Sequence, residues 1–87
     1  MEGAYLARFN AKINRDGAGG CWLWTASTGS HGYGQTWDGN NVLLAHRVAH
    51  QLWIGPIPDG LVVDHLCNIK RCVNPAHLEA KTDRENV

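Results

Sequence analysis

The sequence has no surplus of charge of either sign and no long apolar run. Its 87 residues include eight Lys and Arg against eight Asp and Glu, so it lacks the basic excess that drives non-specific binding to nucleic acid. Contacts with phosphates would have to come from local cations, such as Lys70, Arg71 and Lys81, or from a bound metal ion. No apolar run approaches the roughly 20 residues that span a bilayer, which predicts a soluble protein without a membrane partner.

Cysteine is scarce and odd in number. The three cysteines, Cys21, Cys67 and Cys72, cannot all pair within one chain, and the sequence begins without a basic and then apolar signal segment. These features argue against a secreted disulfide scaffold and favour a cytoplasmic protein. A chain of this length buries only about three-fifths of its unfolded surface, so its core alone gives marginal stability. Five histidines accompany the thiols, and a metal bound by both would supply the missing folding free energy.

Two short helices are expected in residues 1–60. Apolar residues recur every three or four positions over residues 5–13, which predicts an amphipathic helix there. Residues 45–53 also have one apolar helical face, and the Gly- and Pro-rich segment 55–60 ends this second helix.

A small antiparallel sheet is expected between these helices. Strand-forming residues occupy segments 21–25, 32–37 and 42–44, and the Asp-Gly-Asn-Asn sequence at 38–41 predicts a turn between the last two. The glycines around His31 fit either a mobile loop or a tight hairpin. The four tryptophans are expected in the core rather than as platforms for nucleobases: Trp22, Trp24, Trp37 and Trp53.

The last third of the chain, residues 61–87, is expected to form a separate structural unit. Its elements are predicted as a strand, a loop, a strand and a helix, with the strands at 61–66 and 76–80. Thr82 and Glu85 match a capping box, so the helix should start there and place Asn86 in its first turn. The chain is therefore predicted to be one α+β domain.

Three potential metal ligands are grouped around the loop of this unit. Cys67 and Cys72 lie five residues apart, and His77 follows five residues later. Structural zinc favours four tetrahedral thiolate or imidazole ligands, and Cys21 is the natural fourth. A zinc ion there would cross-link the two parts of the chain. The alternative is that these are ordinary buried free cysteines.

Asp64 and His65 combine acid–base and metal-binding chemistry. A histidine with a pKa of about 6.5 is mostly neutral at cellular pH and can take a proton from water, as phosphodiester hydrolysis requires. A divalent ion with oxygen ligands would stabilise the charge on the phosphate, and Asp64 and Asn86 are oxygen donors. Taken alone, His65 is better explained as a structural histidine, but its combination with Asp64, Asn74, His77 and Asn86 reverses that preference.

The segment from Asp64 to Glu79, DHLCNIKRCVNPAHLE, followed by Glu85-Asn86-Val87, closely resembles HNH (ββα-metal) endonucleases of phage and homing type. The nearest likeness is the zinc-bearing His-Cys box subgroup. There the base histidine is followed at offsets of two, seven, twelve and twenty-one by Cys, Cys and His zinc ligands and a metal-binding Asn. The same offsets connect His65 with its matching residues here: Cys67, Cys72, His77 and Asn86.

The upstream sequence resembles the phage members as well. The matching segments are Gly20-Cys21-Trp22-Leu23-Trp24, Gly32-Tyr33-Gly34, Ala45-His46-Arg47 and the Gly- and Pro-rich run 55–60. The resemblance therefore covers most of the chain after Gly19. It implies a C-terminal ββα-metal unit, stapled by zinc, within the α+β domain.

The resemblance also implies residue roles. His65 would be the general base and Asn86 the ligand of a catalytic divalent ion such as Mg²⁺. The structural zinc ligands would be Cys21, Cys67, Cys72 and His77. Many HNH enzymes instead place the last motif residue on the catalytic metal, but the offset match assigns His77 to zinc.

Further roles are less specific. Relatives with Asp before the histidine use it as a second metal ligand, whereas the His-Cys box pattern does without it, which leaves Asp64 open. Arg47 would contact the scissile phosphate, although a surface salt bridge is an equal alternative. Asn74 would hold the loop through its amide. His46 and His50 lie four residues apart on one helix face, as a metal-binding pair would, but no nearby carboxylate completes such a site, so packing and surface roles are expected.

The sequence thus predicts a metal-dependent DNA endonuclease, with Zn²⁺ as structural ion and DNA as partner. Likeness to phage proteins suggests action in the cytoplasm of a phage host. Whether it nicks or cuts both strands depends on a homodimer that the sequence neither indicates nor excludes. The alternatives are a non-catalytic, zinc-stabilised nucleic-acid-binding module and a zinc-organised protein-interaction domain.

Overall fold

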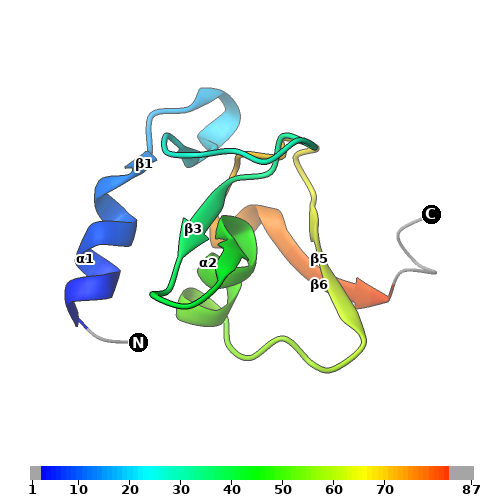
Figure 1. Cartoon of the computed structure of the whole chain (residues 1–87). Helices are drawn as coiled ribbons and strands as arrows, with labels where there is room; N and C mark the ends of the chain where they lie inside the picture. The colour runs from blue at the N-terminus through cyan, green and yellow to red at the C-terminus, as the bar shows by residue number, and fades with distance from the viewer. Residues whose placement is uncertain (1–2, 83–87) are drawn as a thin grey trace.

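Two helices and three pairs of antiparallel strands form the fold of the computed structural model, which describes residues 3–82 (Figure 1). The elements are, in order, α1 (Gly3–Ala11), β1 (Ile13–Asn14), the 3-10 turn η1 (Ala18–Gly20), β2 (Leu23–Trp24), β3 (Gln35–Trp37), β4 (Val42–Leu44), α2 (Ala45–Trp53), β5 (Leu61–His65), the 3-10 turn η2 (Pro75–His77) and β6 (Leu78–Thr82). The predicted α+β class is confirmed, as are the bounds of α2. Helix α2 lies between α1 and the β5–β6 pair (Figure 1).

The single small sheet predicted from residues 21–44 is wrong, because β2 pairs with β1 while β3 pairs with β4. The second edge of β2 is occupied by the loop that follows β5. There the Trp24 amide donates to the Arg71 carbonyl, and the Val73 amide donates to the Trp22 carbonyl, each over 2.8 Å. A strand has only two edges, so β2 has none left for β3.

Helix α1 begins and ends two residues before the predicted range of 5–13. The Lys12 amide donates to the Phe9 carbonyl over 3.1 Å, which closes the last turn of the helix. The next residue, Ile13, then pairs with Trp24 in the β1–β2 ladder. Strand pairing therefore takes over from helical hydrogen bonding, although the apolar spacing continues to Ile13.

The core gathers around Trp24, whose side chain is fully buried. Its buried members come from both helices, three strands and the loop after β5: Phe9, Trp24, Ala45, Val48, Ala49, Val63, Val73 and Leu78. Phe9 stacks at a tilt on Trp24, with ring centroids 4.9 Å apart. The expectation of four core tryptophans is wrong for Trp37, which is 58% exposed beside the turn of the two-stranded β3–β4 hairpin.

The β5–β6 pair forms the C-terminal unit, with Leu61 opposite Thr82 and His65 opposite Leu78. The return strand starts two residues later than predicted because Pro75–His77 forms the turn η2. Thr82 is the last residue of β6. The helix predicted to follow it, with Asn86 in its first turn, lies outside the described residues.

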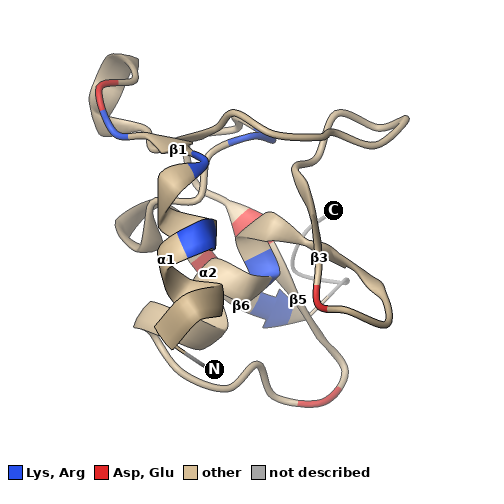
Figure 2. Ribbon diagram, turned by 60° about the vertical axis from the view of Figure 1, so that its left-hand side comes forward, with Lys and Arg blue, Asp and Glu red and all other residues tan. Residues whose placement is uncertain are grey.

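Charged residues of both signs are scattered over the elements in Figure 2, and neither sign is gathered on one of them. This distribution agrees with the balance of eight basic and eight acidic residues. Neither of the helices within residues 3–82 has the length and apolar character needed to cross a bilayer.

Candidate metal centre and active site

Four potential metal ligands meet at one point of the molecule: Cys21, Cys67, Cys72 and His77. Their ligand atoms all lie within 4.8 Å of one another, and Cys21 and Cys72 are fully buried. Nδ1 of His77 lies 3.7 Å from Sγ of Cys21 and 3.4 Å from Sγ of Cys72. The first cysteine follows η1, and the other ligands belong to the β5–β6 connection. The cluster therefore joins the N-terminal part of the chain to the C-terminal unit.

The geometry of this cluster fits a tetrahedral zinc site. Zn–S bonds of about 2.3 Å and Zn–N bonds of about 2.0–2.1 Å place tetrahedral ligand atoms about 3.5–3.8 Å apart. The two distances from Nδ1 of His77, 3.4 and 3.7 Å, are close to this range. The donor set of three thiols and one imidazole also matches the soft ligands that zinc prefers. The cluster could thus bind a metal ion such as zinc.

The electrostatics of the cluster call for a cation. Burial, together with the neighbouring Cys72 and Cys67, raises the pKa of the Cys21 thiol to about 12. Three adjacent thiolates cannot persist in a buried site without a compensating charge. A divalent ion reverses this effect because thiolates are the form that binds metal.

Residues 66–77, which connect β5 to β6 and carry three of the four ligands, are called the metal loop below. Asn74 fastens this loop to the segment before Cys21. Its Nδ2 donates to the Gly20 carbonyl over 2.7 Å, and its Oδ1 accepts from the Ala76 amide over 2.9 Å. The second bond caps η2, which carries His77. One amide therefore sets the positions of ligands from both parts of the chain.

His65 ends β5 with its ring buried, at 6% exposure. Its Nε2 lies 3.0 Å from the Cys72 carbonyl oxygen, and because a carbonyl only accepts, Nε2 carries the proton. Burial lowers the pKa of His65, opposed by this hydrogen bond and by the charge of Asp64. The ring is therefore neutral near pH 7, with the lone pair on Nδ1. Among the described residues no hydrogen bond engages Nδ1, so its lone pair is available as a proton acceptor.

Asp64 points away from His65, as alternation along a strand requires, since Val63 and His65 are the buried residues of β5. Its Oδ2 lies 3.0 Å from Nζ of Lys81 in β6. Directly opposite in the register is a second carboxylate, Glu79, and Lys81 offsets the repulsion between like charges. The Asp64 carboxylate is thus already engaged with a cation.

The remaining predicted site residues are Arg47 and Asn86. Arg47 is the third residue of α2 and is half-buried, and the described residues give it no hydrogen-bond or ion-pair partner. Asn86 lies outside the described residues, so the structure does not place it relative to His65.

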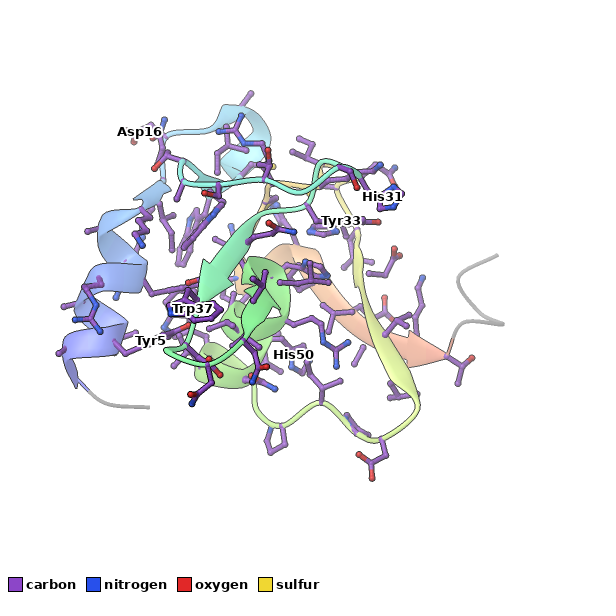
Figure 3. The ribbon with its side chains drawn as sticks, viewed as in Figure 1. Tyr5, Asp16, His31, Tyr33, Trp37 and His50 are labelled. Atoms are coloured by element: carbon purple, nitrogen blue, oxygen red, sulfur yellow. The ribbon has the colours of Figure 1, made fainter. Side chains whose placement is uncertain are left out.

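Sequence reasoning missed a cluster of rings around His65. His46, from the first turn of α2, lies with its ring centroid 4.5 Å from that of His65, and Tyr33 lies 5.3 Å from His46 and 5.8 Å from His65. Tyr33 and His31 sit beside the end of β5 in Figure 3, away from His50. The available signal was a tyrosine between two glycines, Gly32 and Gly34, where an aromatic residue is not needed for the turn.

His46 is buried, at 4% exposure, rather than on the surface. Its Nδ1 has no hydrogen-bond partner among the described residues. Burial and, to a smaller extent, the charges of His65 and Arg47 lower its pKa to about 4, against a partial offset by the Val63 backbone. A neutral imidazole therefore stands against His65 at neutral pH. His50 is buried too, with Nδ1 2.9 Å from the Gly55 carbonyl oxygen.

Together the features define a class: a small α+β domain in which a neutral histidine ends one strand of a pair, and a Cys₃His cluster that could hold a metal ion closes the connection between the two strands. Residues 43–87, about half of the chain, match the family model described as HNH endonuclease. The chain belongs to the HNH endonuclease family. The cluster fits the zinc-bearing type of this family.

Curated relatives come from bacteriophages. Protein 7.7 of Escherichia phage T7 is 38% identical over 66 residues, which are 76% of this chain and 51% of the relative. The uncharacterized gene 5.3 protein of Enterobacteria phage T3 is 38% identical over 44 residues, which are 51% of this chain and 44% of the relative. The chain spans about half the length of these relatives. No solved structure is significantly similar to it.

Proposed function

We propose that this chain is a metal-dependent DNA endonuclease in which His65 takes a proton from the water that attacks the phosphodiester. Membership of the HNH endonuclease family supports nuclease activity and a DNA substrate. The hydrogen bond from Nε2 of His65 to the Cys72 carbonyl carries the proposal, because it leaves the lone pair of Nδ1 as the proton acceptor of the ring.

The other site residues act on the phosphate and on a catalytic ion. When bound, a divalent ion such as Mg²⁺ would stabilise the negative charge that builds up on the phosphate and the leaving oxygen. Asn86 would hold it, and Asp64 would join only after separation from Lys81. Arg47, charged and without a described partner, is suited to donate hydrogen bonds to the scissile phosphate.

Zinc has a structural role in this proposal. Cys21, Cys67, Cys72 and His77 offer four protein ligands, which leave no open position for a substrate. The ion would fix the loop whose Cys72 carbonyl orients His65. Zinc would therefore set the tautomer of the base without contacting the substrate.

A nicking assay with matched histidine variants tests the function. Purified protein is incubated with supercoiled plasmid and Mg²⁺, Mn²⁺ or Ca²⁺ in turn, and its zinc content is measured alongside. We expect nicking by wild type and none by His65→Ala, with zinc retained. His50→Ala is the control, because it truncates another buried histidine near a carbonyl, away from the site. It should lose stability but still nick at a temperature where it is folded.

The same assay separates the alternatives. A wild-type protein that binds plasmid but never nicks with any divalent ion would be a zinc-stabilised nucleic-acid-binding module. A protein without DNA affinity even at low salt would be a protein-interaction domain. If His65→Ala lost zinc or unfolded, the division between catalytic and structural sites would be wrong. The ratio of nicked to linear product, with the mass in solution, would show whether the protein acts as a homodimer that cuts both strands.

A further inference from the structure

We propose that Tyr33 is a positioning residue for His65, which holds the imidazole plane so that Nδ1 faces the attacking water. The inference rests on the proposed function for its catalytic meaning, but the contacts that carry it are independent of that function. One hydrogen bond from Nε2 fixes a single point of the His65 ring. A second constraint is needed to fix the plane, since the χ2 torsion of histidine is broad.

Tyr33 provides this constraint by stacking. Its ring is inclined by 27° to His65, with centroids 5.8 Å apart, and by 31° to His46, with centroids 5.3 Å apart. His46 contacts His65 as well, at 4.5 Å and 48°. The three rings thus lie in mutual contact, and rotation of the His65 plane would require Tyr33 or His46 to move.

Core packing does not account for this position of Tyr33. Its ring is half-buried, and the partly buried hydrophobic residues that pack on the core include Tyr5 but not Tyr33. A half-buried ring removes only part of its apolar surface from water, so the hydrophobic effect alone does not explain the position of Tyr33. Its contacts are instead with the predicted base and the base's buried neighbour.

The loop that carries Tyr33 is attached to both parts of the site. Lys70, from the metal loop, donates from Nζ to the His31 carbonyl over 2.9 Å and lies 5.3 Å from the Tyr33 ring centroid. On the other side of the tyrosine, the Gly34 carbonyl accepts from the first amide of α2, that of Ala45, over 2.8 Å. Tyr33 is therefore held between the metal loop and the helix that carries His46.

The test compares Tyr33→Leu, which removes the ring, with Tyr33→Phe, which keeps it. Nicking rate at saturating enzyme and DNA affinity without divalent ion are measured on the same plasmid. Because small misplacements of a catalytic group cost up to about a hundredfold in rate, we expect Tyr33→Leu to nick at least about tenfold more slowly, with affinity within about twofold. Tyr33→Phe should nick like wild type.

A spectroscopic signature separates this proposal from the proposed function. The ¹⁵N shifts of the His65 ring in the zinc-loaded protein, recorded at pH 8 without Mg²⁺, report which nitrogen carries the proton. Wild type and Tyr33→Phe should show the Nε2–H tautomer alone, and Tyr33→Leu should show a mixture. This readout holds even if wild type fails to nick, which would overturn the proposed function and not the positioning.

Lys70→Met provides a second variant in case Tyr33→Leu does not fold. Lys70 is exposed, so replacing it should leave the fold and the zinc content intact. It should release the loop that carries Tyr33 from the His31 carbonyl contact and give a smaller proportion of the second His65 tautomer than Tyr33→Leu does. A single His65 tautomer in both variants would overturn the proposal. Slow nicking by Tyr33→Leu with an unmixed tautomer would also overturn it, because Tyr33 would then act on the substrate and not through His65.

Discussion

Acidification should destabilise this domain through His46, and the size of the effect follows from its burial. The pKa of His46 is about 4 in the folded protein, against 6.5 for the free side chain. Below pH 6.5 the unfolded chain takes up a proton at this position, but the folded chain does not until the pH approaches 4. Stability that is present above pH 6.5 is therefore lost as the pH falls towards 4.

The magnitude can be worked out for pH 5, between the folded and unfolded pKa values of His46. At pH 5 the unfolded side chain is almost fully protonated and the folded one about a tenth protonated, which corresponds to a loss of about 2 kcal/mol relative to pH 7.5. At still lower pH the whole difference between the unfolded pKa of 6.5 and the folded pKa of about 4 counts, and it corresponds to a loss of about 3 kcal/mol of unfolding free energy. For a small domain this is a large fraction of a total of about 5–15 kcal/mol.

The assay is urea unfolding of wild type and His46→Phe at pH 7.5 and pH 5, with zinc content checked at each pH. Phenylalanine keeps a ring beside the two groups that face His46, Tyr33 and His65, and removes the titrating nitrogens. The zinc ligands and Arg47 are the same in both proteins, so their own pH dependence cancels in the comparison. Between pH 7.5 and pH 5, we expect the unfolding free energy of wild type to fall by about 2 kcal/mol more than that of the variant. An equal fall in the unfolding free energy of the two proteins would show that His46 does not cause the acid destabilisation.

Three further predictions concern the metal loop and the core. Cys72→Ser should lose zinc and unfold, as circular dichroism and metal analysis would show. Structural zinc contributes about 10–16 kcal/mol to folding, which is comparable to the whole stability of a small domain, about 5–15 kcal/mol. Asn74→Ala removes the bond to the Gly20 carbonyl and a cap, and should cost about 1–2 kcal/mol in urea unfolding and weaken zinc in a chelator competition. Gly34→Ala should cost about 1–3 kcal/mol, since its Cβ would lie 2.6 Å from Cδ1 of Trp24; unchanged stability would show that the indole moves freely.

Local patterns predicted the parts of the fold that depend on local interactions. Residues 45–53 form a helix with the predicted bounds because their apolar face and the glycine after Ile54 specify both its packing and its end. The first strand of the C-terminal unit was predicted from its β-branched residues, which is again a local property. The second strand, β6, begins two residues later than predicted because Pro75–His77 forms a turn.

Non-local pairing was not predictable in the same way. The aromatic residues in and beside β2, Trp22 and Trp24, indicate a strand but not its partners, and the partners are β1 and a loop almost fifty residues later in the chain. The metal ligands could be named because their chemistry restricts the choice to cysteine and histidine. The stacking of Tyr33 on His65 depends on how two loops approach each other, which no local spacing encodes.

The pairing of β2 with residues 71–73 limits how this protein can be divided. A fragment starting at residue 43, where the family match begins, would lack the potential zinc ligand Cys21. It would also lack β2, which forms hydrogen bonds with the backbone of residues 71–73. During synthesis, β2 leaves the ribosome long before its partner loop, so the metal loop can close only after residues 67–77 have emerged. Assembly of this site is therefore a late and long-range event in folding, which predicts slow folding for a chain of this size.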